Sequence, residues 1–254
     1  MKSLHKVLHI IDTVADAGKA GIRNISALTG YSPATIHRIV STLVEKKYFV
    51  QDPATKKYAL SLKFLELGTR VQHQIDLTGI ARPHLHRLMG ETREGVNLAV
   101  PVGDEMVYLD HVRSDHSLLQ LFTKPGARVP LYATGVGKLF LSRMNEADFE
   151  AYLDRTNLHP RTPSTIVERE ALRKELDHIL AVGFSVDNEE FEAGVRCVAA
   201  LIFDHSSLPA AAVSISGAVV RITPDRIDHF GKMVRRCAHD ISLEFGFNPM
   251  NGKS

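Results

Sequence analysis

Apolar residues recur at helical spacing in two segments near the beginning of the chain. Leu4–Asp16 carries one apolar stripe, so we expect a helix that ends near Gly18. Within Asn24–Leu43, Ile25 and Leu28 predict the apolar face of a short helix. A longer helix follows, and its predicted apolar face comprises Ile36, Ile39, Val40 and Leu43.

The break between the short and the long helix has residues that suit a tight turn. Gly30 can adopt positive φ, Ser32 can cap the second helix, and Pro33 loses no hydrogen bond at its first position. The outward face of that helix is small, hydrogen-bonding or cationic, and comprises Ala34, Thr35, His37, Arg38 and Ser41. A helix-turn-helix with such a face fits the major groove of DNA. An ordinary helical hairpin with a solvated face is the alternative interpretation.

Two short aromatic and β-branched runs follow, Tyr48–Val50 and Tyr58–Leu60, around an Asp-Pro turn. They predict a hairpin, and three helices followed by a hairpin make a winged helix-turn-helix, which we assign to residues 1–60. Lys56 and Lys57 at the hairpin tip would lie on phosphate, which positions the domain without reading sequence. Taken singly, each lysine also fits a solvated turn.

An apolar stripe at helical spacing continues after the hairpin and comprises Leu60, Phe64, Leu67, Val71 and Ile75. We interpret residues 61–76 as a linker helix that helps to pair two chains, because the short domain before it already has a core. The alternative is that the stripe packs on the C-terminal domain of its own chain.

From residue 77 the pattern changes to short apolar or alternating runs between helical segments. The expected strands are Val96–Val100, Met106–Val112, Leu118–Phe122, Phe184–Asp187, Val195–Phe203 and Ala210–Ser216. The expected helices are Ile80–Glu91, Gly137–Met144, Glu146–Leu153, Val167–Val182 and Pro224–Phe245. Hairpins, such as the one at Gly103-Asp104, with helices around them predict an α+β domain on an antiparallel sheet over residues 77–254.

Charge is divided unequally between the two parts of the 254-residue chain. Residues 1–75 contain 11 Lys+Arg and 5 Asp+Glu, a net charge of +6, whereas the remainder carries −4. A basic first third joined to a mildly acidic remainder indicates a polyanion partner for one end only. This bias coincides with the helix-turn-helix.

The composition, 44% hydrophobic and 24% charged, is that of an ordinary globular protein. No apolar run approaches the roughly 20 residues that span a bilayer, so we expect a cytoplasmic protein without membrane association. The two cysteines, Cys197 and Cys237, have no paired spacing, and the 13 histidines show no metal-ligand spacing. We therefore expect no metal site and no cofactor.

A glycine-rich segment, Ala133–Lys138, begins one of the predicted helices. Its glycines expose backbone N–H groups at a helix start, where the dipole favours an anion. It is not a phosphate-binding P-loop, because Tyr132 stands at the upstream glycine and Leu139 at the required Ser/Thr. A small carboxylate suits the segment better than a nucleotide, and a plain glycine-rich cap is the alternative.

Polar residues at three strands of the second domain are further candidates. Asp187 ends an apolar strand and could point into a pocket, whereas the carboxylates after it are expected to be mostly solvated. Ser214 and Ser216 share one face of a strand, where both can donate to one ligand oxygen or bond to neighbouring backbone. Cys197 in an apolar strand is more typical of a small buried hydrophobe than of a reactive thiol.

Several segments, in their order, resemble the IclR family of bacterial transcriptional regulators over nearly the whole chain. They are GYSPATIHRIVSTL, YALSLKFLELG, PGARVPLYATGVGKLFLS, GFSVDNEEFEAGVRCVAALIFD and AAAVSISG. The resemblance implies a winged-helix DNA-binding domain, a linker helix and a GAF-like effector domain. It also implies dimers or tetramers on pseudo-palindromic operators.

Carried over by position, the resemblance places the recognition helix on Ser32–Leu43, with Thr35, His37 and Arg38 facing DNA. Many members have Lys-Ser where Pro33-Ala34 stands here. The implied effector pocket comprises the backbone N–H groups of Gly135 and Val136, the side chains of Asp187, Ser214 and Ser216, and the walls Cys197, Val129 and Leu118. Val136 replaces a commonly smaller residue, which narrows or reshapes the pocket.

These features together predict a ligand-responsive repressor of a catabolic operon that senses a small organic acid. Its expected partners are a double-stranded DNA operator, a small carboxylate effector and further copies of itself in a homodimer or homotetramer. A small-molecule enzyme with an accessory helical module is the alternative. Against it, the sequence shows neither a nucleophile with a paired base nor a metal cluster.

Overall fold

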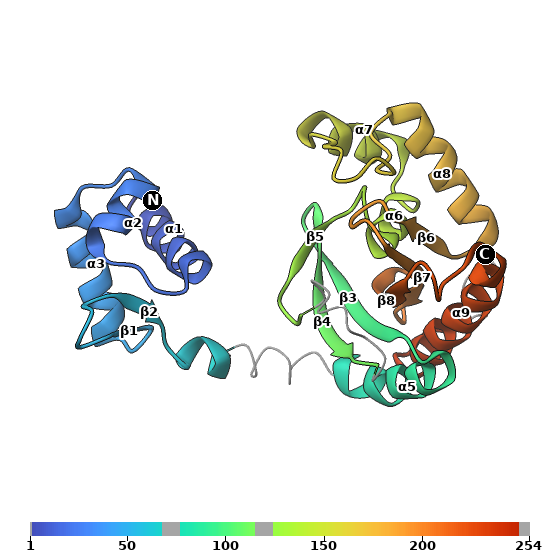
Figure 1. The fold of residues 1–254 in the computed structure, drawn as a ribbon, viewed down its shortest axis with the longest axis horizontal. Coiled ribbons are helices and arrows are strands. Elements are labelled where there is room, and N and C mark those ends of the chain that lie inside the picture. Colours follow the sequence, from blue (N-terminus) through green and yellow to red (C-terminus); the bar gives the residue numbers. More distant parts are fainter. Residues whose placement is uncertain (1, 68–76, 115–123, 249–254) are drawn as a thin grey trace. The chain divides into compact units, whose positions relative to one another are not determined.

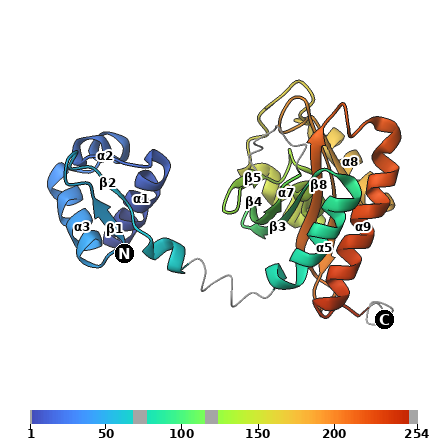
Figure 2. The same cartoon turned by 60° about the horizontal axis from the view of Figure 1, so that its bottom comes forward.

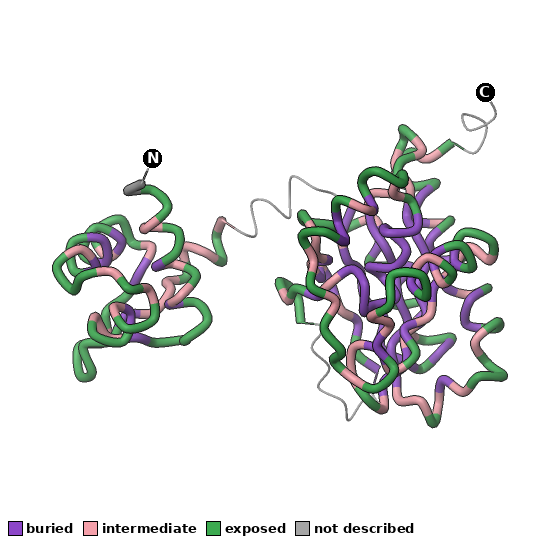
Figure 3. Tube along the Cα trace, turned by 90° about the horizontal axis from the view of Figure 1, so that it is seen from above, coloured by how far each residue is buried: buried purple, intermediate pink, exposed green. Residues whose placement is uncertain are grey.

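The computed structural model describes residues 2–67, 77–114 and 124–248. The chain divides into two compact units, with the boundary between residues 76 and 77. Buried residues gather in the interior of each unit (Figure 3). Each unit therefore has a core of its own.

The first unit consists of three helices and a two-stranded antiparallel hairpin (Figure 1). The helices are α1 (Lys2–Ala17), α2 (Ile22–Thr29) and α3 (Pro33–Glu45), and the strands are β1 (Phe49–Gln51) and β2 (Tyr58–Leu60). Its core comprises Ile10, Val14, Ala20, Ile25, Ile36, Ile39, Val40, Leu43, Phe49 and Tyr58. This confirms the predicted winged helix-turn-helix.

The turn between α2 and α3 has the predicted geometry. Gly30 ends α2 with φ 72°, and the Ser32 side chain caps α3 by accepting from the Thr35 backbone N–H at 3.4 Å. The prediction that Leu28 faces the core is wrong, because its side chain is 58% exposed. The inward stripe of α2 instead comprises Ile22, Ile25, Ser26 and Thr29, and Leu28 lies beside this stripe on the helix surface.

Residues 63–67, after the hairpin, are helical. Leu60 and Phe64 of the predicted linker stripe are partly buried against the core of the first unit. Val71 and Ile75, which continue the stripe, lie outside the described residues.

The second unit is built on a six-stranded antiparallel sheet with the order β5-β4-β3-β8-β7-β6. The strands are β3 (Gly95–Val102), β4 (Glu105–Val112), β5 (Arg128–Pro130), β6 (Ser185–Asn188), β7 (Val195–Phe203) and β8 (Pro209–Ala218). β5 was not predicted, because the sequence analysis expected a turn before these residues and no strand. The strand predicted at Leu118–Phe122 lies outside the described residues.

Helices cover both faces of this sheet (Figures 1 and 2). α5 (Leu77–Thr92) and α9 (Ile227–Glu244), which follows the short 3-10 helix Pro224–Arg226, pack on one face. α6 (Gly135–Leu141), α7 (Glu146–Arg155) and α8 (Arg169–Val182) pack on the other. The predicted α+β class and antiparallel sheet are therefore confirmed.

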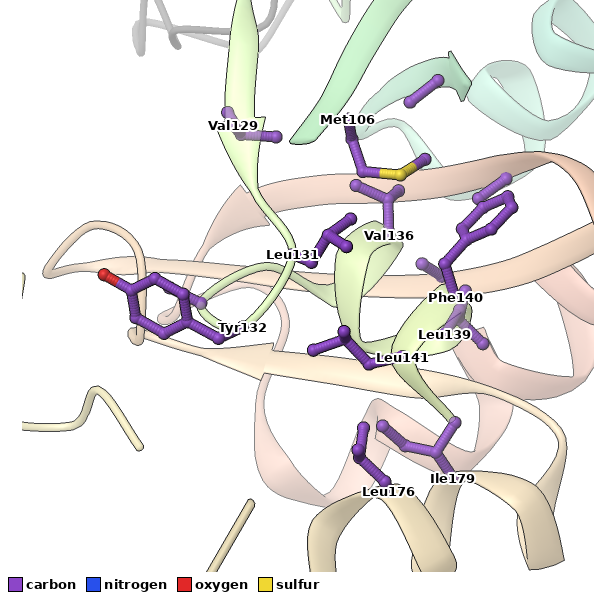
Figure 4. Packing of buried hydrophobic residues seen from close by; sticks show 14 of the residues in the cluster. Met106, Val129, Leu131, Tyr132, Val136, Leu139, Phe140, Leu141, Leu176 and Ile179 are labelled. Atoms are coloured by element: carbon purple, nitrogen blue, oxygen red, sulfur yellow. The ribbon is translucent and has the colours of Figure 1, made fainter. Parts of the chain in front are cut away.

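The short helix α6 lies close to the sheet and begins two residues earlier than predicted. Figure 4 shows Val136 of α6 directed towards Met106 of β4, with Leu176 and Ile179 of α8 at the other end of the helix. Gly137 permits α6 to lie against the backbone that follows β5, since a Cβ there would lie 2.3 Å from the Cα and 2.4 Å from the carbonyl oxygen of Leu131.

Gly137→Ala is expected to lower the free energy of unfolding by about 3 kcal/mol or more, because the backbone of Leu131 cannot yield as a flexible side chain would. Urea unfolding of the full chain measures this loss. Gly90→Ala is the matched control: nothing lies within 4 Å of a Cβ at this helical position, so it should gain about 1 kcal/mol. Equal stability of the two variants would contradict the packing argument.

Candidate functional site

A small cavity lies between the start of α6 and the sheet. The described residues that line it are Tyr108, Val129, Thr134, Gly135, Val136, Asp187, Phe191, Glu192, Val195, Cys197, Ser214 and Ser216. Its volume of about 30 Å³ accommodates one or two water molecules. A larger ligand therefore needs the cavity to widen.

The structure thus brings together every predicted effector residue that it describes; Leu118 lies outside the described residues. The sequence analysis missed Tyr108, Thr134, Phe191, Glu192 and Val195. Tyr108 and Met106, two residues apart on β4, are both buried, and this period-two pattern was the available signal for Tyr108.

Strand register places the polar residues side by side. Asp187 of β6 pairs with Cys197 of β7, which pairs with Ser216 of β8. The start of α6 lies over this part of the sheet, because a Cβ on Gly135 would be 3.5 Å from the Asp187 backbone nitrogen. Side chains from three strands and backbone from one helix therefore meet at one place.

The first two N–H groups of α6 have no hydrogen-bond acceptor among the described residues. The capping hydroxyl of Thr134 accepts from Gly137 at 3.2 Å, and the Thr134 carbonyl accepts from Lys138 at 2.9 Å. Gly135 and Val136 are left as donors beside the cavity. A helix start also carries partial positive charge, so this edge of the cavity favours an anion.

Behind the two serines lies Asn97 of β3, a fully buried residue that the sequence analysis missed. Its Nδ2 donates to Ser214 Oγ at 3.1 Å and to Ser216 Oγ at 3.0 Å. Its Oδ1 lies 2.6 Å from Nδ1 of His111 on β4. Neighbouring Val96 and Leu98 belong to the core on the opposite face of the sheet, so an asparagine between them was the signal for a polar cluster.

Asp187 is 4% exposed. Its Oδ1 accepts from the backbone N–H groups of Glu190 at 2.8 Å and Phe191 at 3.3 Å. Burial and the nearby Glu190 carboxylate raise the pKa of Asp187 to about 7. A large share of this carboxyl is therefore protonated at neutral pH and can donate a hydrogen bond.

The acidic loop was expected to be mostly solvated, but the structure buries part of it. Glu190 is buried, and its Oε1 accepts from Lys138 Nζ at 2.6 Å. Lys138 is fully buried and also donates to Glu175 of α8 at 2.8 Å. A buried lysine must find carboxylates, so Lys138 fixes the acidic loop over the cavity instead of binding phosphate.

The thiol of Cys197 has no features of a nucleophile. Burial and the nearby Asp187 raise the pKa of this thiol. Burial, Cys197 and Asp187 likewise raise the pKa of Tyr108. Raised values keep both groups neutral. In the described ranges, no group of three or more His, Cys, Asp or Glu is arranged to hold a metal ion.

In the first unit, the outward face of α3 presents polar groups. Ala34, His37, Arg38 and Ser41 are exposed, whereas Thr35 is half-buried and hydrogen-bonded to Ser32. Ser32 and Pro33 are exposed at the start of this helix, and Lys56 and Lys57 are exposed on the hairpin. Asp52 shapes the hairpin turn by accepting from two backbone N–H groups at 3.0 Å.

Comparisons with known proteins agree over the whole chain. Residues 3–53 match the IclR helix-turn-helix domain, and residues 69–243 match the family of bacterial transcriptional regulator IclR C-terminal domains. The transcriptional repressor IclR of Escherichia coli is 32% identical over 249 residues, which cover 97% of this chain and 90% of that protein.

Solved structures give the same result. The crystal structure of Thermotoga maritima IclR has a TM-score of 0.76 and 33% identity, and covers 97% of this chain and 100% of that one. An IclR homologue from Microbacterium hydrocarbonoxydans, crystallised with 4-hydroxybenzoate, shares the fold with a TM-score of 0.84 at 22% identity, over 96% of this chain and 98% of that one.

The molecule is therefore a DNA-binding transcriptional regulator with a C-terminal effector-binding domain. It belongs to the IclR family of bacterial transcriptional regulators. Membership decides against the enzyme alternative and, because bacterial regulators act on DNA in the cytoplasm, confirms the expected location. No helix within the described ranges is long and apolar enough to cross a membrane.

Asp187→Asn is expected to stabilise the chain at alkaline pH. The folded pKa lies above the ordinary value of 3.8, so the aspartate favours folding below pH 4 and loses that contribution as the pH rises through about 7. The amide stays neutral and keeps the Oδ1 acceptor. At pH 8 the variant should gain about 1–3 kcal/mol, and near pH 4 the gain should disappear.

Thermal unfolding at pH 4.5 and at about pH 8 measures this difference. Asp177→Asn, which alters an exposed aspartate of α8, is the control and should leave the pH dependence unchanged. Identical pH profiles for the parent and Asp187→Asn would contradict a buried, largely protonated carboxyl.

Proposed function

We propose that the protein is a repressor of a catabolic operon and that a small organic acid controls it by binding in the cavity of the second unit. The observation that carries this proposal is the convergence of donors there: the N–H groups of Gly135 and Val136 and the hydroxyls of Ser214 and Ser216 all border one cavity. A carboxylate has acceptor oxygens only, which matches such a set.

The rest of the cavity supports an acid with an apolar body. Val129, Val136, Phe191 and Val195 supply apolar wall, and Leu118 is a further proposed wall position. Cys197 completes the wall as a small neutral group. The relative from Microbacterium hydrocarbonoxydans was crystallised with 4-hydroxybenzoate, which makes aromatic acids reasonable candidates beside aliphatic ones.

We propose that α3 enters the major groove of an operator, with Thr35, His37, Arg38 and Ser41 towards the bases and with Ser32, Pro33 and Ala34 at the backbone. Exposure of Arg38 and His37 on one helix face supports this assignment. Lys56 and Lys57 on the hairpin would contact phosphate.

The proposed organisation is a DNA-binding domain at residues 1–60, a linker helix at 61–76 and an effector domain at 77–254, in a homodimer or homotetramer. Two copies would place two recognition helices on two half-sites. The effector would then act by binding one arrangement of the copies more tightly than another, because equal affinity for both would shift nothing.

Arg38→Ala should weaken operator binding by about 1–3 kcal/mol through the loss of a bidentate base contact. Fluorescence anisotropy with a duplex selected by the full chain from a random library measures this loss. The parent affinity should fall steeply with salt, because bound lysines and arginines release counterions. Lys174→Ala, which removes an exposed charge from α8, is the control and should bind as the parent does. An unchanged affinity of the Arg38→Ala variant would show that Arg38 does not contact the operator.

The effector site is tested with a panel of acetate, lactate, benzoate and 4-hydroxybenzoate. At least one acid should raise the thermal midpoint of the parent chain by mass action. Ser214→Ala and Ser216→Ala should each reduce that rise, whereas Ser164→Ala, at an exposed serine, should keep it. A panel without effect on the parent, or serine variants that respond fully, would contradict the proposed site.

A further inference from the structure

We infer that Asn97 is a positioning residue that makes the cavity selective for a carboxylate over the matching amide or amine. This inference rests on the proposed function and deepens it. Asn97 does not itself line the cavity. It acts through the two serine hydroxyls, because its hydrogen bonds decide whether they present hydrogens or lone pairs to the cavity.

The amide nitrogen of Asn97 has two hydrogens, and the structure assigns one to each serine. Both donor–acceptor distances, 3.1 Å to Ser214 and 3.0 Å to Ser216, are typical of N–H donors; hydroxyl donors usually lie closer, at about 2.7–2.8 Å. The serine oxygens are therefore the acceptors in these bonds.

His111 holds the amide in this orientation. Its Nδ1 lies 2.6 Å from Asn97 Oδ1, and an amide oxygen can only accept, so Nδ1 carries the hydrogen of the ring. Rotation of the Asn97 amide by 180° would break this hydrogen bond with His111 and point the amide oxygen at the serines. The cross-strand pairing of Asn97 with both His111 and Ser214 keeps the three side chains together.

The consequence for a ligand follows from the hydrogen bonds that a serine hydroxyl can donate and accept. Each serine oxygen already accepts from Asn97, so each hydroxyl must use its hydrogen as a donor in another direction. Ser216 pairs across the strands with Cys197, whose thiol is a weak hydrogen-bonding group that a ligand oxygen can displace as a partner. Together with Gly135 and Val136, both serines then present hydrogens to the cavity.

These four donors disfavour a ligand group that brings its own donors to the serines and the start of α6, whereas the carboxyl groups of Asp187 and Glu192 also belong to the lining. A carboxylate satisfies the set, whereas a primary amide places an N–H₂ group against hydroxyl or backbone hydrogens and leaves a buried polar group unpaired. Such discrimination requires the serine orientation, and therefore Asn97. Its complete burial means that solvent does not compete for its hydrogens.

The test changes the polarity without changing the shape. Asn97→Asp replaces the donor nitrogen by an acceptor oxygen, so the serine hydroxyls should turn towards residue 97 and present lone pairs to the cavity. Thermal-shift titration compares four acids, acetate, lactate, benzoate and 4-hydroxybenzoate, with their primary amides on the full chain. Asn157→Asp, at an exposed asparagine, is the control for the added charge.

The parent should bind at least one acid at least 10-fold more tightly than its amide, and Asn97→Asp should reduce this ratio at least 10-fold. The Asn157→Asp control should keep the parent ratio. In a Ser214→Ala/Ser216→Ala background, Asn97→Asp should change the ratio much less, because the serines carry the effect.

Each other outcome identifies what has failed. If no acid binds the parent, the proposed function falls and the inference falls with it. If an acid binds the parent and Asn97→Asp lowers acid and amide affinity equally, Asn97 is only structural and the inference alone is wrong. If Asn97→Asp fails to fold, Asn97→Leu serves instead: it releases the hydroxyls, so the amide should gain relative to the acid, and an unchanged ratio would overturn the inference.

Discussion

The interaction on which the second unit depends is the buried ion pair of Lys138 with Glu190. Lys138 Nζ bonds to Glu190 at 2.6 Å and to Glu175 at 2.8 Å, so one ammonium joins α6, α8 and the loop after β6. Loss of one member of a buried ion pair costs about 3–5 kcal/mol. The same loop supplies Phe191 and Glu192 to the cavity, and its position therefore depends on this charge.

The ion pair also explains the charge state of the cavity. Lys138 compensates Glu190, while Asp187 remains in the same buried region with a pKa of about 7. The described residues that line the cavity include no lysine or arginine, and the donors at the start of α6 and on β8 are neutral groups. A bound carboxylate would be held by dipoles and hydroxyls, which suits an effector that must also dissociate.

Much of the fold could be predicted from the sequence, because it is encoded by local periodicity. The stripe of Ile36, Ile39, Val40 and Leu43 and the cap at Ser32 define α3 without any tertiary information. The prediction for Leu28 was wrong because α2 has only eight residues, and its inward stripe comprises Ile22, Ile25, Ser26 and Thr29 with Leu28 beside it.

The candidate site could be predicted only in part. Gly135, Ser214 and Asp187 stand out as glycines or polar groups in apolar segments, and the family resemblance supported them. The roles of Asn97 and Glu190 could not be predicted, because they depend on partners far away in the sequence: Ser214 for Asn97, and Lys138 for Glu190. Strand register places Asn97 beside Ser214, and no local pattern reports which strands pair.

The most direct measurement of the central claim is a crystal structure of the full chain with the panel acid that gives the largest thermal shift. We expect one carboxylate between the start of α6 and β8, with oxygens within about 3.2 Å of Gly135 or Val136 nitrogen and of Ser214 or Ser216 Oγ. An acid bound elsewhere, such as in the groove that Arg235 of α9 and Leu180 of α8 line, would contradict it.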